Sequence, residues 1–209
     1  MVLKVGSLSI IKRKELDKYQ VVLWDLDNTL YTENDFLFQA YNEFSAKYFA
    51  HNSKAFEFLK STFLLEGRGG LVQKFAHKFN IDTGLEDLKG SFFTVMREGD
   101  FQLLLNPKIE ECLGKLSRDH IRQGIITNGN VAQQENKIKS LGLLEKFPFL
   151  TIVYANEGEK KPSPWSYLEM KKRLSIKPDD KVLYIGDSDV DKIFAERAGI
   201  DFIFVQDIL

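Results

Sequence analysis

The stretch VVLWDLDNTL, residues 21–30, decides the fold of this chain. Its first four residues are apolar and two of them are β-branched, which predicts a buried strand. Asp25 and Asp27 follow, and their side chains converge only if the chain turns directly after the strand, which residues 27–29 allow. Carboxylates at this end of a parallel strand lie where α/β sheets bind ligands. Two neighbouring carboxylates repel each other, so we expect them to bind a divalent cation, and Mg²⁺ fits best. The alternative is an Asx turn that binds no ligand.

The composition is that of an ordinary globular protein. The chain has 209 residues, of which 44% are hydrophobic and 28% are charged, and its formal net charge is −1. This charge gives no basic field, so we expect no nucleic-acid partner. The first residues lack the apolar core of a signal peptide, and no apolar run approaches membrane-spanning length. A single cysteine, Cys112, fits a reducing compartment, and we expect a cytoplasmic monomer or homodimer without a membrane partner.

A helical pattern follows Thr32. Leu37, Tyr41 and Phe44 are spaced as one face of a helix, and apolar residues at similar spacing continue to about residue 103. Twelve of the 17 phenylalanines lie in this segment, where helical spacing favours packing in the segment's own core. We therefore expect an all-helical domain over residues 33–103.

From Asn106 onward, helices and strands alternate. The expected helices are 107–118, 131–141 with Gly142 at its end, 164–174 and 190–198, and the expected strands are 123–127, 149–154, 181–186 and 201–205. A further short strand is expected at residues 8–11. Such alternation predicts an α/β fold, a doubly wound parallel sheet with helices on both faces. Residues 1–32 and 104–209 would form this core domain.

Two of the expected strands are followed by polar side chains suited to an anion. Thr127 and Asn128 end one strand, where a hydroxyl and the N–H groups of the next turn can hold phosphate oxygens; an ST turn or helix N-cap is the alternative. Lys161 follows another strand, and Pro162 and Pro164 stiffen its backbone. A fixed ammonium group near aspartates binds anions, whereas the alternative is an ordinary surface lysine.

The stretch GDSDVD, residues 186–191, follows the strand expected at 181–186. Asp187 is placed like Asp25, and Asp191 lies one helical turn further on the same side. Asp189 is explained as a first-turn acid that the helix dipole favours. Because parallel strands end at one edge of a sheet, we expect these acids near Asp25, where they need a cation.

Taken together, these sites resemble the haloacid dehalogenase superfamily in its phosphatase branch. The four family motifs match, in order, residues 25–29, Thr127, Lys161 and residues 186–191. The helical segment after the first motif resembles the four-helix cap of that family, and the likeness covers residues 20–205. The sequence departs mildly from the family pattern in two ways. About twenty residues precede the first motif, which is more than usual, and a second lysine, Lys160, stands directly before Lys161. The proline after Lys161 makes Lys161 the better match to the motif.

The resemblance implies catalytic roles. Asp25 would attack phosphorus and form an aspartyl-phosphate, and Asp27 would protonate the leaving oxygen and then activate water. Thr127, Lys161 and Asn128 would hold the phosphoryl group. These roles agree with the chemistry, because phosphoryl transfer needs positioning and charge neutralisation, and covalent catalysis splits hydrolysis into two steps.

The resemblance also implies a metal site. Mg²⁺ would be bound by the carboxylates of Asp25 and Asp187 and by the backbone carbonyl of Asp27, with Asp191 supporting through water. Mg²⁺ between nucleophile and phosphate lets two anions approach each other.

The expected function is a Mg²⁺-dependent phosphatase that hydrolyses a small soluble phosphomonoester, either a sugar phosphate or a nucleoside monophosphate. A phosphomutase that uses the same aspartyl-phosphate is an alternative, because the sequence does not show whether water or a second sugar hydroxyl intercepts the intermediate. A dehalogenase is disfavoured because that branch lacks the second aspartate, here Asp27. A non-catalytic regulatory module is the third alternative, and the presence of every motif residue argues against it.

Residues 67–70, with the sequence GRGG, interrupt the helical segment. Glycines permit a close approach and Arg68 suits an anion, so this loop is a candidate for substrate binding. The alternative is an ordinary turn between two helices. We expect the hinges of the helical domain near residues 30–34 and 99–104, where the chain leaves and re-enters the core.

Overall fold

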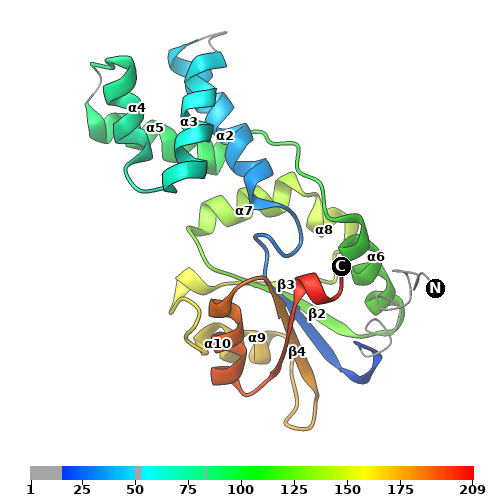
Figure 1. The fold of residues 1–209 in the computed structure, drawn as a ribbon. Coiled ribbons are helices and arrows are strands. Elements are labelled where there is room, and N and C mark those ends of the chain that lie inside the picture. Colours follow the sequence, from blue (N-terminus) through cyan, green and yellow to red (C-terminus); the bar gives the residue numbers. More distant parts are fainter. Residues whose placement is uncertain (1–15, 50–52, 83) are drawn as a thin grey trace, which may run out of the picture.

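The computed structural model describes residues 16–49, 53–82 and 84–209. Within these ranges, five strands form one sheet in which every neighbouring pair is parallel, in the order β3-β2-β1-β4-β5 (Figure 1). The strands are β1 (Val21–Trp24), β2 (Arg122–Thr127), β3 (Thr151–Tyr154), β4 (Val182–Gly186) and β5 (Asp201–Phe204). Because all of them run the same way, their carboxyl ends meet at one edge, with β1 in the centre.

Helices cover both faces of the sheet. They are α6 (Pro107–Arg118), α7 (Val131–Ser140) and α8 (Leu143–Lys146), followed by α9 (Trp165–Arg173) and α10 (Asp189–Ala198). The side chains of β1 alternate between two apolar clusters: Val22 and Trp24 pack with residues of α6 and α7, and Val21 and Leu23 with residues of α9 and α10. All four β1 residues are fully buried, as their unbroken apolar run predicts. The doubly wound parallel sheet is confirmed.

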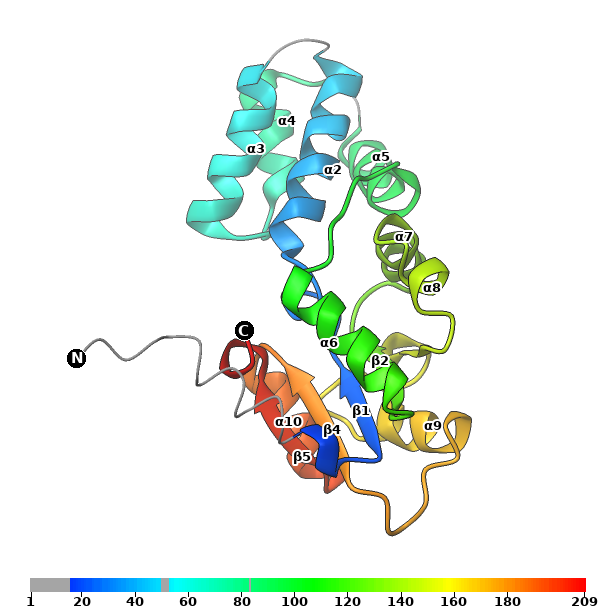
Figure 2. The ribbon, with the colours of Figure 1, turned by 90° about the vertical axis from the view of Figure 1, so that its right-hand side faces the viewer.

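Four helices form a cap above the carboxyl edge of the sheet (Figures 1 and 2). They are α2 (Glu33–Tyr48), α3 (Ser53–Glu66), α4 (Leu71–Phe79) and α5 (Leu85–Glu98). Aromatic rings fill the cap: the Phe44 ring lies 5.4 Å from the Phe75 ring and 5.1 Å from the Phe92 ring. The all-helical cap is thus confirmed, and most of its phenylalanines serve its own core.

The chain differs from the expected pattern after α7. Gly142 is left-handed, with φ 60°, as expected for a glycine that ends a helix. The short helix α8 follows it, however, and the sequence pattern did not predict this helix because four residues are too few to show a helical period. The strand expected at residues 8–11 lies outside the described residues. Within the described ranges, no helix combines the length and the apolar character that crossing a membrane requires.

Candidate active site

The turn after β1 gives Asp25 and Asp27 different surroundings. Asn28 adopts the left-handed conformation, φ 57°, which asparagine tolerates better than most residues, and its Oδ1 accepts a hydrogen bond from the N–H of Glu33 at 3.0 Å. The chain therefore turns at the position that the sequence predicts. Asp25 stays buried at the strand end, 6% exposed, while Asp27 lies further along the turn.

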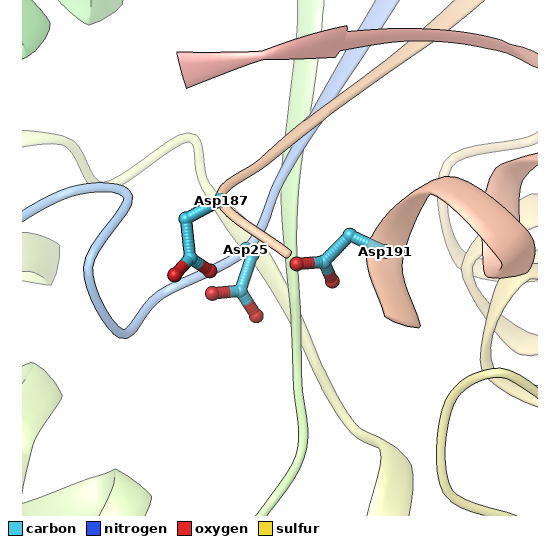
Figure 3. A group of neighbouring side chains, drawn as sticks. All are labelled: Asp25, Asp187 and Asp191. Carbon is cyan, nitrogen blue, oxygen red and sulfur yellow. The ribbon is translucent and has the colours of Figure 1, made fainter. Parts of the chain in front are cut away.

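Three carboxylates converge at the carboxyl edge of the sheet. Asp25 follows β1, Asp187 follows β4 and Asp191 lies in the first turn of α10 (Figure 3). One oxygen from each lies within 4.8 Å of the others. The parallel β1–β4 pairing brings two segments 162 residues apart in sequence to the same point, as the two strand-end motifs predict.

Lys161 lies at the centre of this group. Its Nζ is 2.5 Å from Oδ1 of Asp25 and 2.7 Å from Oδ1 of Asp191, and it also donates to the hydroxyl of Tyr184 at 2.7 Å. The ammonium group has three hydrogens, so these partners satisfy all of them. Lys161 is only 5% exposed, so the alternative reading of a surface lysine is wrong.

Burial and charge repulsion act strongly on the carboxylates. Burial raises the pKa of Asp25 to about 7, although Lys161 opposes this shift. Burial and then the charge of Asp191 raise the pKa of Asp187. For Lys161, burial acts to lower the pKa, but Asp25 and Asp191 outweigh it and the pKa is raised. The ammonium group is therefore charged, and one positive charge faces three carboxylates.

This imbalance fits a bound cation. Carboxylate oxygens are hard ligands of the kind that Mg²⁺ prefers, and a second positive charge would offset the burial and the mutual repulsion that together raise the pKa of Asp25 and Asp187. Asp25, Asp187 and Asp191 are the side chains able to hold it, and the backbone carbonyl of Asp27 follows two residues after Asp25.

Two local motifs orient the residues around this group. Oδ2 of Asp191 accepts hydrogen bonds from the backbone N–H of Ser188 at 3.2 Å and from its hydroxyl at 2.6 Å, which forms a capping box at the start of α10. The Asn128 side chain holds the backbone of Lys161, accepting from its N–H at 2.9 Å and donating to its carbonyl at 3.1 Å. The side chain of Asn128 thus positions the lysine.

Asp27 is held by residues that the sequence analysis missed. Lys137 Nζ lies 2.8 Å from each of its two carboxylate oxygens. Tyr31 donates its hydroxyl to Oδ1 at 2.6 Å, and Gln134 donates to Oδ2 at 3.0 Å. The same Gln134 amide nitrogen lies 2.6 Å from Oγ1 of Thr127. Thr127 and Asp27 therefore share one partner and lie on the same side of the site.

The missed residues left a weak signal in the sequence. Gln134 and Lys137 are three residues apart on α7, so they share a helix face, and both are only 1% exposed. A glutamine and a lysine on the face that also carries Ile138 break the apolar pattern of a buried helix face. That break indicates a buried polar contact but does not identify the partner, because Asp27 is 110 residues away from Lys137.

Arg68 lies between the cap and this network. Its guanidinium is 2.6 Å from Oε2 of Glu33 at the start of α2, and the Arg68 side chain is 55% exposed. Glu33 also lies 3.5 Å from Lys137. Arg68, Glu33, Lys137 and Asp27 thus form a chain of charge contacts from the loop between α3 and α4 to the turn after β1.

The structure is thus a parallel α/β sheet with a helical cap, and a group of carboxylates around a buried lysine lies at the carboxyl edge of the sheet. Residues 22–205 match the family described as haloacid dehalogenase-like hydrolase, and the chain belongs to that family. The resemblance inferred from the four motifs is therefore confirmed.

Individual relatives add detail. A segment of 95 residues, 45% of this chain, is 32% identical to a glyceraldehyde 3-phosphate phosphatase of Methanopyrus kandleri; the aligned part spans 40% of that protein. Among solved structures, a protein provisionally named beta-phosphoglucomutase from Thermotoga maritima is 22% identical, with a TM-score of 0.65 over 86% of this chain and 82% of that one. A hydrolase from Streptococcus pneumoniae is 20% identical, with a TM-score of 0.57 over 89% of this chain and 92% of that one. At these identities the solved structures show the shared fold.

Proposed function

We propose that this chain is a Mg²⁺-dependent phosphatase that hydrolyses a small phosphomonoester through an aspartyl-phosphate. The observation that carries the proposal is the group formed by Asp25, Asp187, Asp191 and Lys161, in which a buried carboxylate lies beside an ammonium group and two further acids. A carboxylate nucleophile and charge neutralisation are what phosphoryl transfer needs. The relative from Methanopyrus kandleri is named as a phosphatase.

The metal site of the proposal consists of Asp25, Asp187, Asp191 and the backbone carbonyl of Asp27. When bound there, Mg²⁺ would neutralise charge on the nucleophile and on the phosphoryl group, so that two anions approach each other. The charge imbalance of the site, three carboxylates against one ammonium group, supports this assignment.

The first half of the reaction belongs to Asp25. Its carboxylate oxygen attacks phosphorus, the bond from phosphorus to the ester oxygen breaks, and the phosphoryl group remains on Asp25. Lys161 lies 2.5 Å from this carboxylate and is therefore beside any phosphoryl group that Asp25 attacks. Thr127, whose hydroxyl shares Gln134 with Asp27, would hold another phosphoryl oxygen.

The second half belongs to Asp27. In this assignment Asp27 gives a proton to the leaving ester oxygen, then takes one from the water that attacks the aspartyl-phosphate. A single group poised as acid and then as base serves both steps. Three side chains orient its carboxylate, which supports a role in which position matters: Lys137, Tyr31 and Gln134.

The helical cap would close over the substrate and exclude bulk water from the reaction. In this proposal the cap comprises residues 33–103, the core residues 1–32 and 104–209, and the hinges lie near residues 30–34 and 99–104. The substrate of this proposal is a small molecule, because the cap helices lie beyond the edge of the sheet at which the strands end (Figure 1). A cytoplasmic location remains part of the proposal, on the basis of the single cysteine.

The test measures phosphate release from acetyl phosphate, sugar phosphates and nucleoside monophosphates, with Mg²⁺ and with excess chelator. We expect turnover with Mg²⁺, loss of turnover in chelator and recovery when Mg²⁺ is returned. Full turnover in chelator contradicts the metal assignment. Transfer of phosphate to a second sugar hydroxyl without release identifies a phosphomutase, and no turnover of any phosphate supports the non-catalytic alternative.

A further inference from the structure

The hydroxyl of Tyr184 is a polar group inside the apolar layer between the sheet and helices α9 and α10. Tyr184 lies on β4, where alternate side chains point to opposite faces, and its ring joins the apolar cluster that contains Phe194 of α10. The Tyr184 side chain is fully buried, and its ring centroid lies 4.9 Å from that of Phe194. A buried hydroxyl is unfavourable unless it is hydrogen-bonded, so its partners indicate what it does.

The partners of this hydroxyl come from three other parts of the chain. Lys161 Nζ donates to it at 2.7 Å. The hydroxyl lies 3.0 Å from the backbone carbonyl oxygen of Ile126 on β2 and 3.4 Å from Oδ1 of Asp191 on α10. An ammonium group has only donors, so the hydroxyl oxygen accepts from Lys161, and its single hydrogen is left for the nearer acceptor, Ile126. The lysine therefore meets an oxygen lone pair whose direction a strand carbonyl fixes.

Tyr184 and Lys161 differ in how firmly their backbones are held. β4 pairs with β1 on one side and with β5 on the other, so Tyr184 belongs to the interior of the sheet. Lys161 lies between the short helix η2 (Ala155–Glu157) and α9, outside any helix or strand. Its ammonium group is carried by a flexible four-carbon stem. A strand holds a group more precisely than a loop does, so Tyr184 is the rigid partner of the two.

The proposed chemistry uses the other two partners of Lys161. Asp25 is the proposed nucleophile and Asp191 is a proposed metal ligand, and their carboxylates converge (Figure 3). Tyr184 has neither role, so its contact with Lys161 can stay unchanged when a phosphoryl group or a cation binds. One N–H that is fixed on Tyr184 restricts rotation of the ammonium group, and another N–H then remains directed at Asp25.

We infer that Tyr184 is a positioning residue that acts through Lys161. Its hydroxyl fixes the ammonium group so that one N–H is directed at Asp25 and at the phosphoryl group that Asp25 would attack. This inference rests on the proposed phosphatase function and adds to it a residue that lies outside the four sequence motifs. Small errors in the placement of a catalytic group slow a reaction strongly, so the effect belongs in kcat.

Kinetics with para-nitrophenyl phosphate and Mg²⁺ test the role of the hydroxyl. Tyr184→Phe keeps the ring and removes only the hydroxyl, so Lys161 loses one of its three acceptors. We expect kcat to fall about tenfold with little change in KM, as the loss of a hydrogen bond to a charged group predicts. Tyr167→Phe is the matched control, because Tyr167 packs in the same apolar cluster but lies on α9. An unchanged kcat in Tyr184→Phe, or an equal loss in both variants, contradicts the positioning role.

Nuclear magnetic resonance tests the contact itself, without turnover and without added metal. In protein labelled at the lysine side-chain nitrogens, a buried and fully hydrogen-bonded ammonium group exchanges its hydrogens slowly with water and gives a separate signal. Lys161→Met identifies the signal of Lys161. We expect Tyr184→Phe to speed this exchange about tenfold and Tyr167→Phe to leave it unchanged. The absence of a slowly exchanging Lys161 signal in the unaltered chain, or equal exchange in Tyr184→Phe, would overturn the inference.

The two measurements separate this inference from the proposed function. If the unaltered chain hydrolyses no phosphate ester, the phosphatase proposal fails, while the lysine signal still shows whether Tyr184 holds Lys161. If the ester is hydrolysed and Tyr184→Phe leaves kcat or the lysine signal unchanged, the phosphatase proposal stands and the positioning role of Tyr184 is wrong.

Discussion

Lys137 holds Asp27 by both carboxylate oxygens, each 2.8 Å from its Nζ. The lysine is 1% exposed, lies 4.8 Å from the centroid of the Phe36 ring and also contacts Glu33. A buried ammonium group on the rigid helix α7 thus sets the orientation of a carboxylate on the turn after β1. Because Lys137 touches Asp27 and the proposed chemistry is done by Asp27, we assign Lys137 as a positioning residue.

Replacing Lys137 should therefore affect kcat more than KM. Lys137→Met keeps much of the side-chain volume but releases Asp27, and we expect kcat to fall about 10- to 100-fold because misplacing a catalytic group is costly. Lys137→Arg restores the charge and should recover part of the loss. Lys139→Met on the exposed side of α7 is the control. An equal loss in Lys137→Arg and Lys137→Met, or a loss fully explained by lowered thermal stability, would refute the positioning role.

A trapping experiment should distinguish the roles of Asp25 and Asp27. Asp25→Asn removes the attacking oxygen, so no covalent intermediate should form. Asp27→Asn keeps the nucleophile but loses proton transfer, with an expected loss of about 10²–10⁴-fold in rate. With an aryl phosphate, whose leaving group needs little protonation, Asp27→Asn should accumulate phosphate on Asp25.

Mass spectrometry of peptides, taken after each protein is mixed with the aryl phosphate, identifies the residue that carries phosphate. Two proteins serve as controls. The unaltered chain should be phosphorylated quickly, and Asp25→Asn should not be phosphorylated. Phosphate found on another residue, or normal turnover by Asp25→Asn, is incompatible with the assigned mechanism.

Arg68 should contribute to substrate affinity. Arg68 lines a cavity between α2, α4 and α5 and its side chain is 55% exposed, so its positive charge is accessible to an anionic substrate. Arg68→Ala should raise KM roughly tenfold. It should lower the free energy of unfolding by only about 1 kcal/mol, because the Arg68 side chain is 55% exposed and Glu33, 14% exposed, keeps its contact with Lys137. Lys74→Ala, which removes the cap's exposed pair between Lys74 and Glu66, is the control. Unchanged kinetics in Arg68→Ala would show that residues 67–70 are an ordinary turn without a role in substrate binding.

Gly186 should not tolerate a side chain. A Cβ there would lie 2.6 Å from both Cβ and Cγ of Asp191, closer than atoms pack. Gly186→Ala should lower the free energy of unfolding by about 1–3 kcal/mol and reduce activity by displacing Asp191. Gly114→Ala in α6 is the control, since its Cβ meets only Arg118 Nη1, at 3.6 Å, and it should be neutral or stabilising. Denaturant unfolding measures the free energy of unfolding of both variants. Equal values would show that Asp191 moves aside without destabilising the protein.

The sequence alone predicted the sheet, the cap and the region of the site. Apolar runs that end in Asp25, Thr127 or Asp187 identify strands and their carboxyl ends, because the side-chain period of a strand is local. The spacing of aromatic residues identified the cap for the same reason. Once the strands are taken as parallel, their polar ends meet at one edge, and the grouping of Asp25 with Asp187 follows without knowledge of any contact.

Only the tertiary structure showed what holds Asp27 and which side chains line the cavity between α2, α4 and α5. Lys137 and Gln134 reach the turn after β1 because α7 packs beneath α5 and beside that turn, and no local pattern encodes a contact between residues 110 positions apart. The buried Tyr41 hydroxyl, which has no hydrogen-bond partner among the residues that the structure describes, likewise depends on how α2, α4 and α5 pack together. A repeating pattern specifies an element and its buried face, whereas the partner of each buried polar group is decided by the packing of whole elements.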